Sequence, residues 1–213
     1  VLNLITNSLS RMTITPEGVL VIGHTAAVMS PGAESPLQVV GTSGDNSYNS
    51  FSRFSADASG ASLSLMSSRN GTAGSHTYVQ ENDELGRLQF RGSNGSTFDS
   101  IGGEIGVYVD GEPGSGGDSS DMPGRMVFST TPDGANVPVE RMRIDEAGDV
   151  EIGQTNFNPK IQAGSGASAG NVGYSFRGDT DTGMSSGGEA NILQFITNAE
   201  ARMVLDNNSR ISL

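Results

Sequence analysis

The sequence is short of the side chains that build a compact core. Its 213 residues include no Cys and no Trp, 6% are aromatic and 34% are hydrophobic, whereas Gly occurs 30 times. Glycine adds no side chain to a core, while ordering each residue costs roughly 1–2 kcal/mol of backbone entropy. A chain of this composition therefore either stays disordered or shares its apolar faces with other chains. The absence of Cys excludes disulfide bonds and fits assembly in a reducing cytoplasm.

Basic residues and long apolar runs are scarce as well. The sequence has 12 Lys and Arg residues and 24 Asp and Glu residues, which gives a net charge of −12. Binding to nucleic acid requires a basic surface that releases counterions, so we expect no nucleic-acid partner. No apolar run approaches the ~20 residues that cross a bilayer, so we expect no membrane insertion. The first residues, 1–4, lack the basic start of a signal peptide. Since the chain also begins inside the first copy of the repeat described below, we expect it to be a fragment of a longer one.

One strand–turn–strand pattern occurs three times. Counting from Met142, apolar residues lie at offsets +2, +8 and +10, and the same offsets hold from Met12 and Met203. The apolar residues at these offsets are Ile14, Leu20 and Ile22 in the first copy, Ile144, Val150 and Ile152 in the second, and Leu205, Ile211 and Leu213 in the third. Side chains of a strand alternate between its faces, so each copy places these residues on one face. Such regularity argues against disorder and favours shared apolar faces.

The rest of the chain predicts an all-β fold. Alternating runs are separated by turn signals such as Asn70-Gly71 and Asn94-Gly95, and no helical period is sustained. The runs expected to form strands in the middle of the chain are 51–54, 61–66, 77–80, 87–90, 101–109 and 125–129. We predict a first repeat over residues 1–23, a linker over 24–36, an inserted β domain over 37–131, a second repeat over 126–153, a Gly/Ala/Ser-rich connector over 154–173 and a third repeat over 174–213.

The repeated motif resembles the modules of bacteriophage tail fibres. The resemblance lies in Arg141-Met142-Arg143-Ile144, in the acidic, glycine-bearing turn that follows, and in Val150-Glu151-Ile152-Gly153. The segments 52–60, 83–86, 121–131 and 175–183 resemble such fibres too. The resemblance implies an elongated, intertwined homotrimer that is assembled in the host cytoplasm and carried on the virion tail. It also implies contact with other virion tail proteins, attachment to a host surface glycan or outer-membrane protein, and a chaperone domain that once followed Leu213.

Two alternative functions are a fibre-borne glycan depolymerase and a purely architectural virion fibre or connector with no host contact. Glycan cleavage needs two carboxylates held some 5–10 Å apart, and the candidate pairs are Asp83 with Glu84, Asp118 with Asp121, and Asp179 with Asp181. Each pair lies in a turn-like segment, where Asp typically caps backbone amides. The sequence at 166–170 matches G-x-S-x-G, but no helical segment follows it, and only His24 and His76 are available as a base. We therefore predict no enzymatic activity and no catalytic residues.

No metal or cofactor is predicted, and the repeated arginines are expected to be structural. Residues 179–183 place oxygen ligands at alternate positions, but the closing acid of a calcium loop would have to be Glu189, so a plain Asx turn is favoured. Arg11, Arg141 and Arg202 are expected to cover apolar surface with their stems and to pair with acids across chains. Host contact is assigned to the loops at 110–121 and 43–49, because loops on a strand scaffold typically carry binding sites.

Overall fold

The computed structural model describes residues 1–28, 35–44, 49–114, 120–153, 174–176, 179–186, 192–206, 208 and 211–212. Within these residues the protein is all-β, which confirms the predicted fold class, and its strands form three separate sheets. The chain divides into two compact units, Val1–Phe157 and Asn158–Leu213. No helix in the described part of the chain has the length and apolarity needed to span a bilayer.

The N-terminal sheet contains the first repeat and one strand from beyond the predicted linker. Its strands are β1 (Leu2–Thr6), β2 (Leu9–Ile14), β3 (Leu20–Ile22) and β4 (Leu37–Val39), in that order. The first three pair antiparallel, and β4 pairs parallel to β3. Asn7 and Ser8 form the tight β1–β2 turn with φ values of 51° and 61°, the left-handed conformation that such hairpin turns require. The sheet therefore draws strands from both sides of residues 24–36.

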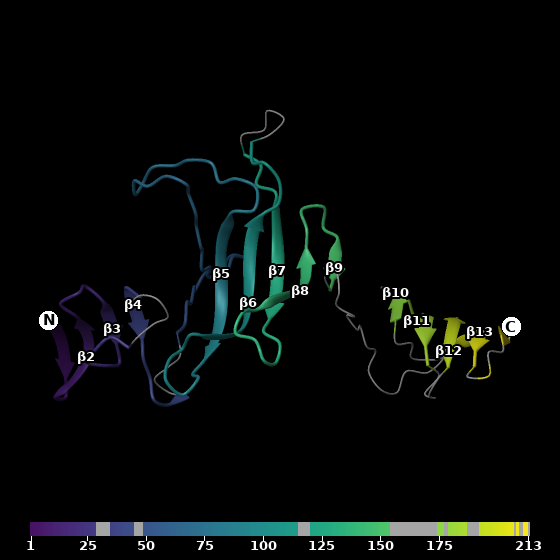
Figure 1. Ribbon diagram of the computed structural model, residues 1–213, viewed down its shortest axis with the longest axis horizontal. Coiled ribbons are helices and arrows are strands. Elements are labelled where there is room, and N and C mark those ends of the chain that lie inside the picture. Colours follow the sequence, from purple (N-terminus) through teal and green to yellow (C-terminus); the bar gives the residue numbers. More distant parts are fainter. Residues whose placement is uncertain are drawn as a thin grey trace. The chain divides into compact units, whose positions relative to one another are not determined.

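The central sheet is a five-stranded antiparallel meander (Figure 1). It consists of β5 (Glu84–Gly92), β6 (Ser100–Val109), β7 (Gly124–Thr130), β8 (Val139–Ile144) and β9 (Val150–Ile152). The second repeat, β7 to β9, is continuous with β5 and β6, which belong to the predicted inserted domain. Residues 37–131 therefore contribute to two sheets, with β4 in the first and β5 to β7 in the second.

The strands predicted at 51–54, 61–66 and 77–80 are not present. The structure has no strand between residues 49 and 83, although β5, β6 and β7 do cover the predicted runs further along. Alternation shows only that a segment suits a pleated, half-buried surface, whereas a strand also needs a partner for its backbone hydrogen bonds. The single chain places no partner strand beside residues 49–83, so they run without a ladder.

The C-terminal sheet contains the third repeat. Its order is β10 (Tyr174–Phe176), β11 (Asp179–Ser185), β12 (Leu193–Thr197), β13 (Glu200–Leu205) and β14 (Ile211–Ser212), all antiparallel. Asn198 and Ala199, with φ values of 51° and 57°, form the same left-handed turn between β12 and β13 that joins β1 to β2. The predicted connector, 154–173, lies outside the described residues.

The three copies of the motif pair in the same register. Met12 lies opposite Leu4, Met142 opposite Phe128, and Met203 opposite Phe195. Immediately after each of these pairs the register shifts by one residue, and the residue left without a partner is the arginine that precedes each methionine. A bulge of this kind bends and twists a hairpin at a defined position. The repeat predicted from residue spacing is therefore also a repeat of backbone geometry.

The turn of the second repeat depends on a glycine. Gly148 has φ +87° and donates to the Asp145 carbonyl at 3.1 Å, and a Cβ at this position would meet nothing within 4 Å. A substitution therefore tests backbone strain alone. We expect Gly148→Ala to destabilise the protein by roughly 1–2 kcal/mol, because a left-handed conformation costs an L-residue about that much. Gly148→Asn is the matched control and should lose less stability, because Asn adopts the left-handed conformation more readily than Ala. Denaturant midpoints measure both, and equal midpoints for Ala and Gly would contradict the prediction.

Candidate functional site: uncovered apolar sheet faces

One face of the central sheet carries apolar side chains in register across all five strands. The first row across the sheet is Leu88, Ile105, Phe128, Met142 and Ile152, and the second is Gly86, Val107, Met126, Ile144 and Val150. These rows contain no charged residue, yet Leu88, Met126 and Val150 are 49%, 41% and 58% exposed. The predicted apolar face exists, and the single chain leaves much of it exposed.

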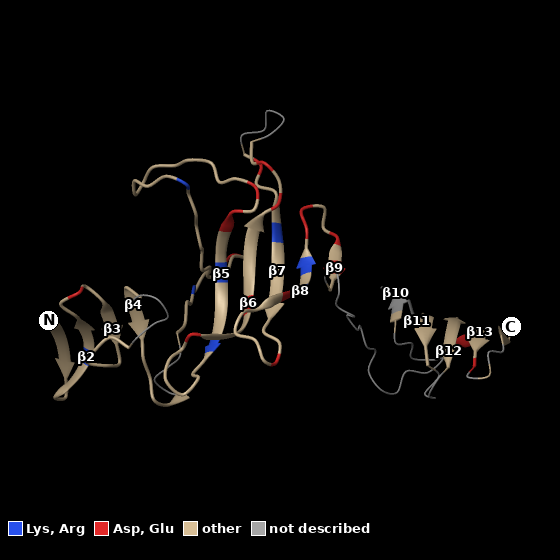
Figure 2. Ribbon diagram, viewed as in Figure 1, with Lys and Arg blue, Asp and Glu red and all other residues tan. Residues whose placement is uncertain are grey.

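The opposite face of the central sheet is charged. Arg143 pairs with Glu140 (Nε–Oε1, 2.5 Å) and approaches Glu151 at 3.7 Å. Arg87 pairs with Glu84 and lies 3.6 Å from Glu104 on the neighbouring strand. Figure 2 shows these basic positions along β5 and β8, with acidic positions at the turns. Of the two faces, the one that suits water is therefore the charged one.

The N-terminal sheet also leaves its more apolar face exposed. Thr13 and Val21, directly opposite each other, are 1% and 0% exposed, and the Thr13 hydroxyl donates to Asn3 Oδ1 at 2.8 Å. The other face carries the repeat's apolar residues and is open: Leu2, Leu4, Ile14 and Ile22 are all exposed. A row of smaller side chains that includes Thr13 and Val21 is thus buried within the chain, while the row of larger aliphatic side chains is exposed.

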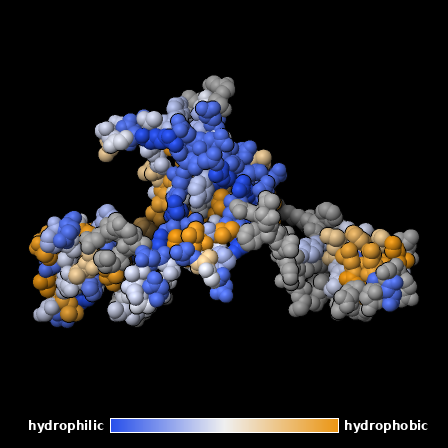
Figure 3. Space-filling model, viewed as in Figure 1, coloured by the Kyte–Doolittle hydropathy of each residue, from blue (hydrophilic) through white to orange (hydrophobic). Residues whose placement is uncertain are grey.

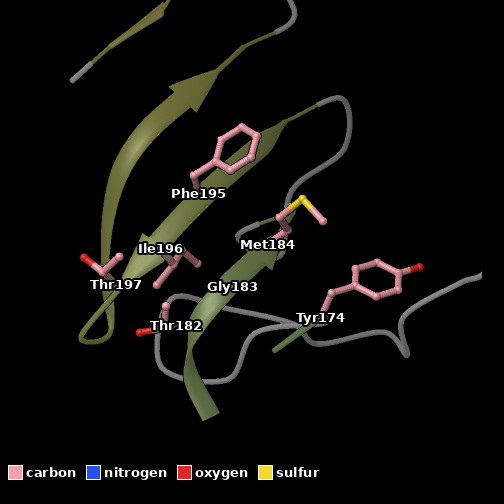
Figure 4. Close-up of a pocket in the computed structure, with 7 residues that line it drawn as sticks. All are labelled: Tyr174, Thr182, Gly183, Met184, Phe195, Ile196 and Thr197. Carbon is pink, nitrogen blue, oxygen red and sulfur yellow. The ribbon is translucent and has the colours of Figure 1, made fainter. Parts of the chain in front are cut away.

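The C-terminal sheet carries an aromatic row. Tyr174, Met184, Phe195 and Met203 lie opposite one another on β10 to β13, and Figure 4 shows the first three projecting from neighbouring strands. They border a hollow of about 450 Å³ that Ile196, Thr182, Gly183 and Thr197 also line. Phe195 is 39% exposed, whereas Ile196 on the opposite face is 2% exposed. Apolar surface gathers over this sheet and over the N-terminal sheet in Figure 3.

Uncovered faces of this extent mark an interaction surface. Monomeric soluble proteins rarely expose contiguous apolar patches larger than a few hundred Å², and larger ones typically bind another surface. Covering apolar surface contributes about 25 cal/mol per Å², so three such faces represent the main source of stability that the single chain leaves unused. This arrangement is suited to assembly.

Each repeated arginine holds a threonine of the preceding strand. The Nε of Arg11, Arg141 and Arg202 donates to the hydroxyl of Thr6, Thr130 and Thr197 respectively, each at 2.9 Å. Arg202 also pairs with Glu200 at 2.8 Å. The bulge brings this guanidinium back to the adjacent strand, so a structural role within the hairpin is present in all copies. Pairing of these arginines with acids across chains stays a prediction.

The candidate carboxylates Asp83 and Glu84 are each held by a different arginine. Arg69 donates to both Asp83 oxygens, at 2.6 and 2.7 Å, and the Gln80 amide donates to Oδ2 at 2.8 Å. These hydrogen bonds, that of Arg69 foremost, lower the pKa of Asp83 to about 2. Glu84 is bound by Arg87. These two neighbouring carboxylates thus have separate cationic partners and fasten the start of β5.

The Asp83 ion pair predicts a pH dependence of stability. Since the pKa of Asp83 is lower in the folded protein than in the unfolded chain, the ion pair stabilises the fold fully above about pH 4 and is lost as the pH falls toward 2. The effect is small, because both side chains are partly exposed. We expect the melting-temperature difference between wild type and Asp83→Asn to shrink over that range. A difference that is constant from neutral pH to pH 2 would contradict this.

Arg125 organises the end of the central sheet from which the loop 110–121 leaves. It donates to Asp110 Oδ1 at 2.7 Å, to the Val109 carbonyl at 3.1 Å and to Asn82 Oδ1 at 2.9 Å, and it lies 5.4 Å from the centre of the Tyr108 ring. Burial raises the pKa of Asp110, but hydrogen bonds from Arg125 and from Glu146 in the β8–β9 turn outweigh this effect, so the pKa is lowered overall. The base of the predicted contact loop is thus rigidly held.

The remaining candidates are local or lie outside the described residues. His24 is exposed and bonds within its own turn, its Nδ1 lying 2.8 Å from the Ala26 carbonyl oxygen, and His76 is exposed. Asp121 accepts a hydrogen bond from the Gly114 amide within the loop. Asp118, Glu189, residues 45–48 and 166–170, and the side chains of Asp179 and Asp181 are not described. No group of three His, Asp or Glu side chains among the described residues is placed to hold a metal ion.

Sequence reasoning did not identify the Arg125 cluster or the threonine partners of the repeated arginines. Arg125 and Asn82 are 43 residues apart and join only through the sheet topology. The threonines were detectable, since Leu4-Ile5-Thr6-Asn7 and Phe195-Ile196-Thr197-Asn198 match at the same distance from the arginine. The spacing indicates that these threonines repeat, but their hydrogen bonds to the arginines form only because the bulge turns each arginine toward the neighbouring strand.

Comparison with known proteins gives a likeness in structure only. No protein-family model and no curated protein matches the chain. The carboxy-terminal domain of the bacteriophage T5 L-shaped tail fibre with its intramolecular chaperone domain aligns with a TM-score of 0.56 and 16% identity, over 72% of this chain and 43% of that one. A second structure of that carboxy-terminal domain aligns with a TM-score of 0.54 and 17% identity, over 73% of this chain and 63% of that one. The chain thus spans less than two thirds of either, and the predicted resemblance to bacteriophage tail fibres is confirmed at the level of the fold.

Proposed function

We propose that this chain is a structural and adhesive segment of a bacteriophage tail fibre that acts as a homotrimer. The observation that carries the proposal is the set of uncovered, uncharged faces on all three sheets, with charged side chains on the opposite face of the central one. In a ring of three copies each apolar face is covered by its neighbours, and the charged faces remain in water. The fold shared with the T5 tail fibre domain supports the same role.

The homotrimer is tested by the mass of the native assembly. Sedimentation equilibrium or native mass spectrometry of the purified chain should give three times the chain mass of 22.0 kDa. A ring closes when the same heterologous interface repeats around an axis, so the assembly should not grow with concentration. A stable, cooperatively melting single chain would overturn the proposal.

Attachment to the host cell is assigned to loops carried by the sheets. The loop 110–121 leaves the central sheet beside the Arg125 cluster, which fixes the direction of its first residues. The loop at 43–49 is the second candidate. Three copies of a weak site gain avidity when they engage one surface together. In this account the chain is part of the virion tail, contacts other tail proteins, and meets a glycan or an outer-membrane protein of the host.

Cell binding separates an adhesive fibre from a purely architectural one. Fluorescently labelled trimer is added to a panel of bacterial strains, and bound label is measured with and without excess unlabelled trimer. Competable binding to a subset of strains is the expected result. Periodate or protease treatment of the cells then distinguishes a glycan from a protein receptor. A trimer that binds no strain of a panel that supports the phage would leave the architectural role and overturn the adhesive one.

A further inference from the structure

Residues 51–66, which we call the arm, are exposed and carry large apolar side chains. Phe54 is 98% exposed, Met66 89% and Leu63 62%, and Phe51 and Leu65 are also at least half exposed. The arm contains no strand, and no backbone–backbone hydrogen bond of the described turns and loops involves it. So many exposed apolar groups on one short segment are costly in water unless another surface covers them.

The arm suits an apolar surface in pattern and charge. In Ala61-Ser62-Leu63-Ser64-Leu65 small polar and apolar residues alternate, as in a strand that packs on one side. Arg53 and Asp57 are the charged residues of the arm, and they pair with each other at 2.7 Å. The arm therefore has no net charge to place against the uncharged rows of the central sheet.

The arm meets the central sheet of its own chain at one edge. Leu65 lies over Gly86, where a Cβ would come within 2.6 Å of the Leu65 Cβ, and Gly86 is the β5 position of the row that contains Met126 and Val150. Beyond Leu65, the bidentate Arg69–Asp83 pair fixes the chain where it returns to β5. The arm is thus fastened at its C-terminal end, on the apolar side of an edge strand.

The arm does not cover the face that it reaches. Leu63, Phe54 and Phe51 remain exposed, and so do Met126, Ile144 and Val150 of the sheet. Two uncovered apolar surfaces adjoin at an edge strand, and in a closed ring the edge of one copy faces the next copy. A closed ring of copies would therefore bring the arm of one copy to the uncovered face of its neighbour.

We propose that the arm packs across the apolar face of the central sheet in the next copy of the chain, an inference that rests on the proposed homotrimer. The neighbouring sheet then supplies the apolar cover that the alternating side chains of residues 61–66 lack within their own chain, and it buries Phe54 and Leu63. Each copy gives one arm and receives one, so the exchange closes with the ring.

A single tryptophan tests the proposal, because the chain has none of its own. Phe54→Trp is prepared alone and together with Ile152→Glu, which places a charge on the receiving face. We expect a trimer whose tryptophan emission is blue-shifted and several-fold less quenched by acrylamide than that of the double variant. In the double variant, a single chain, the emission should be that of a tryptophan in water.

The other outcomes separate the two proposals. A trimer with a water-exposed Trp would overturn the arm exchange and leave the homotrimer intact, and a single chain without Ile152→Glu would overturn both. Blue-shifted emission in a single chain would mean that the arm folds back on its own sheet, which also overturns the exchange. If Phe54→Trp does not fold, trypsin cleavage of unmodified protein after Arg53 serves instead: it should be several-fold slower in the trimer than in the Ile152→Glu chain, and equal rates would contradict the exchange.

Discussion

We expect Ile152→Glu to convert the proposed homotrimer into single chains. Ile152 lies on β9 in the apolar row with Met142 and Phe128, and it is 39% exposed in the single chain, so a glutamate there can remain hydrated when the chain is alone. In the trimer the same carboxylate would be buried against an uncharged face. An unpaired buried charge costs several kcal/mol, and the substitution introduces one in each copy. We therefore expect assembly to be lost while the individual sheets remain folded.

The matched control is Glu151→Gln, one residue earlier and on the charged face. Glu151 is exposed and lies 3.7 Å from Arg143, an interaction of at most about 1 kcal/mol at a surface. Sedimentation should therefore show trimer for Glu151→Gln and single chains for Ile152→Glu, with similar far-ultraviolet circular dichroism. An Ile152→Glu protein that remains trimeric would show that the apolar face is not the interface. Unfolding of both variants would show instead that β9 cannot be altered.

The repeat and the all-β fold could be predicted from sequence because both depend on local spacing. Met12, Met142 and Met203 repeat the same offsets, and the hairpin register follows them because strand side chains alternate with period two. The turns at Gly18 and Gly148 follow for a similar reason, since both have φ +87° where glycine is favoured.

Features that depend on distant partners could not be predicted in this way. The alternation at residues 61–66 is the same as in a strand, but whether a strand forms depends on a neighbour that a single sequence does not name. Asp83 was recognised as a turn acid, and its partner Arg69, 14 residues away, was not. The bulge that places each arginine beside a threonine likewise arises from pairing between strands and has no signal in composition.

Truncating two neighbouring residues of β12, one at a time, tests whether another chain covers the exposed face of the C-terminal sheet. Ile196 is 2% exposed and Phe195 is 39% exposed, and the two side chains lie on opposite faces of the strand. Truncating a fully buried Ile to Ala typically costs 2–5 kcal/mol, and a buried Phe 3–5 kcal/mol, whereas a partly exposed side chain loses less. If the single chain were the functional state, Ile196→Ala would be clearly the more destabilising substitution.

We expect the two substitutions to be about equally destabilising, because the proposed trimer would cover the row of Tyr174, Met184 and Phe195 with neighbouring copies. The measurement is the free energy of unfolding per chain at fixed chain concentration, since the stability of an assembly depends on concentration. Repeating both substitutions in the Ile152→Glu background, where the chains are separate, supplies the control, and there Phe195→Ala should lose most of its effect. A Phe195→Ala cost that is small in both backgrounds would mean that water and no second chain covers the aromatic row, so that the C-terminal sheet takes no part in assembly.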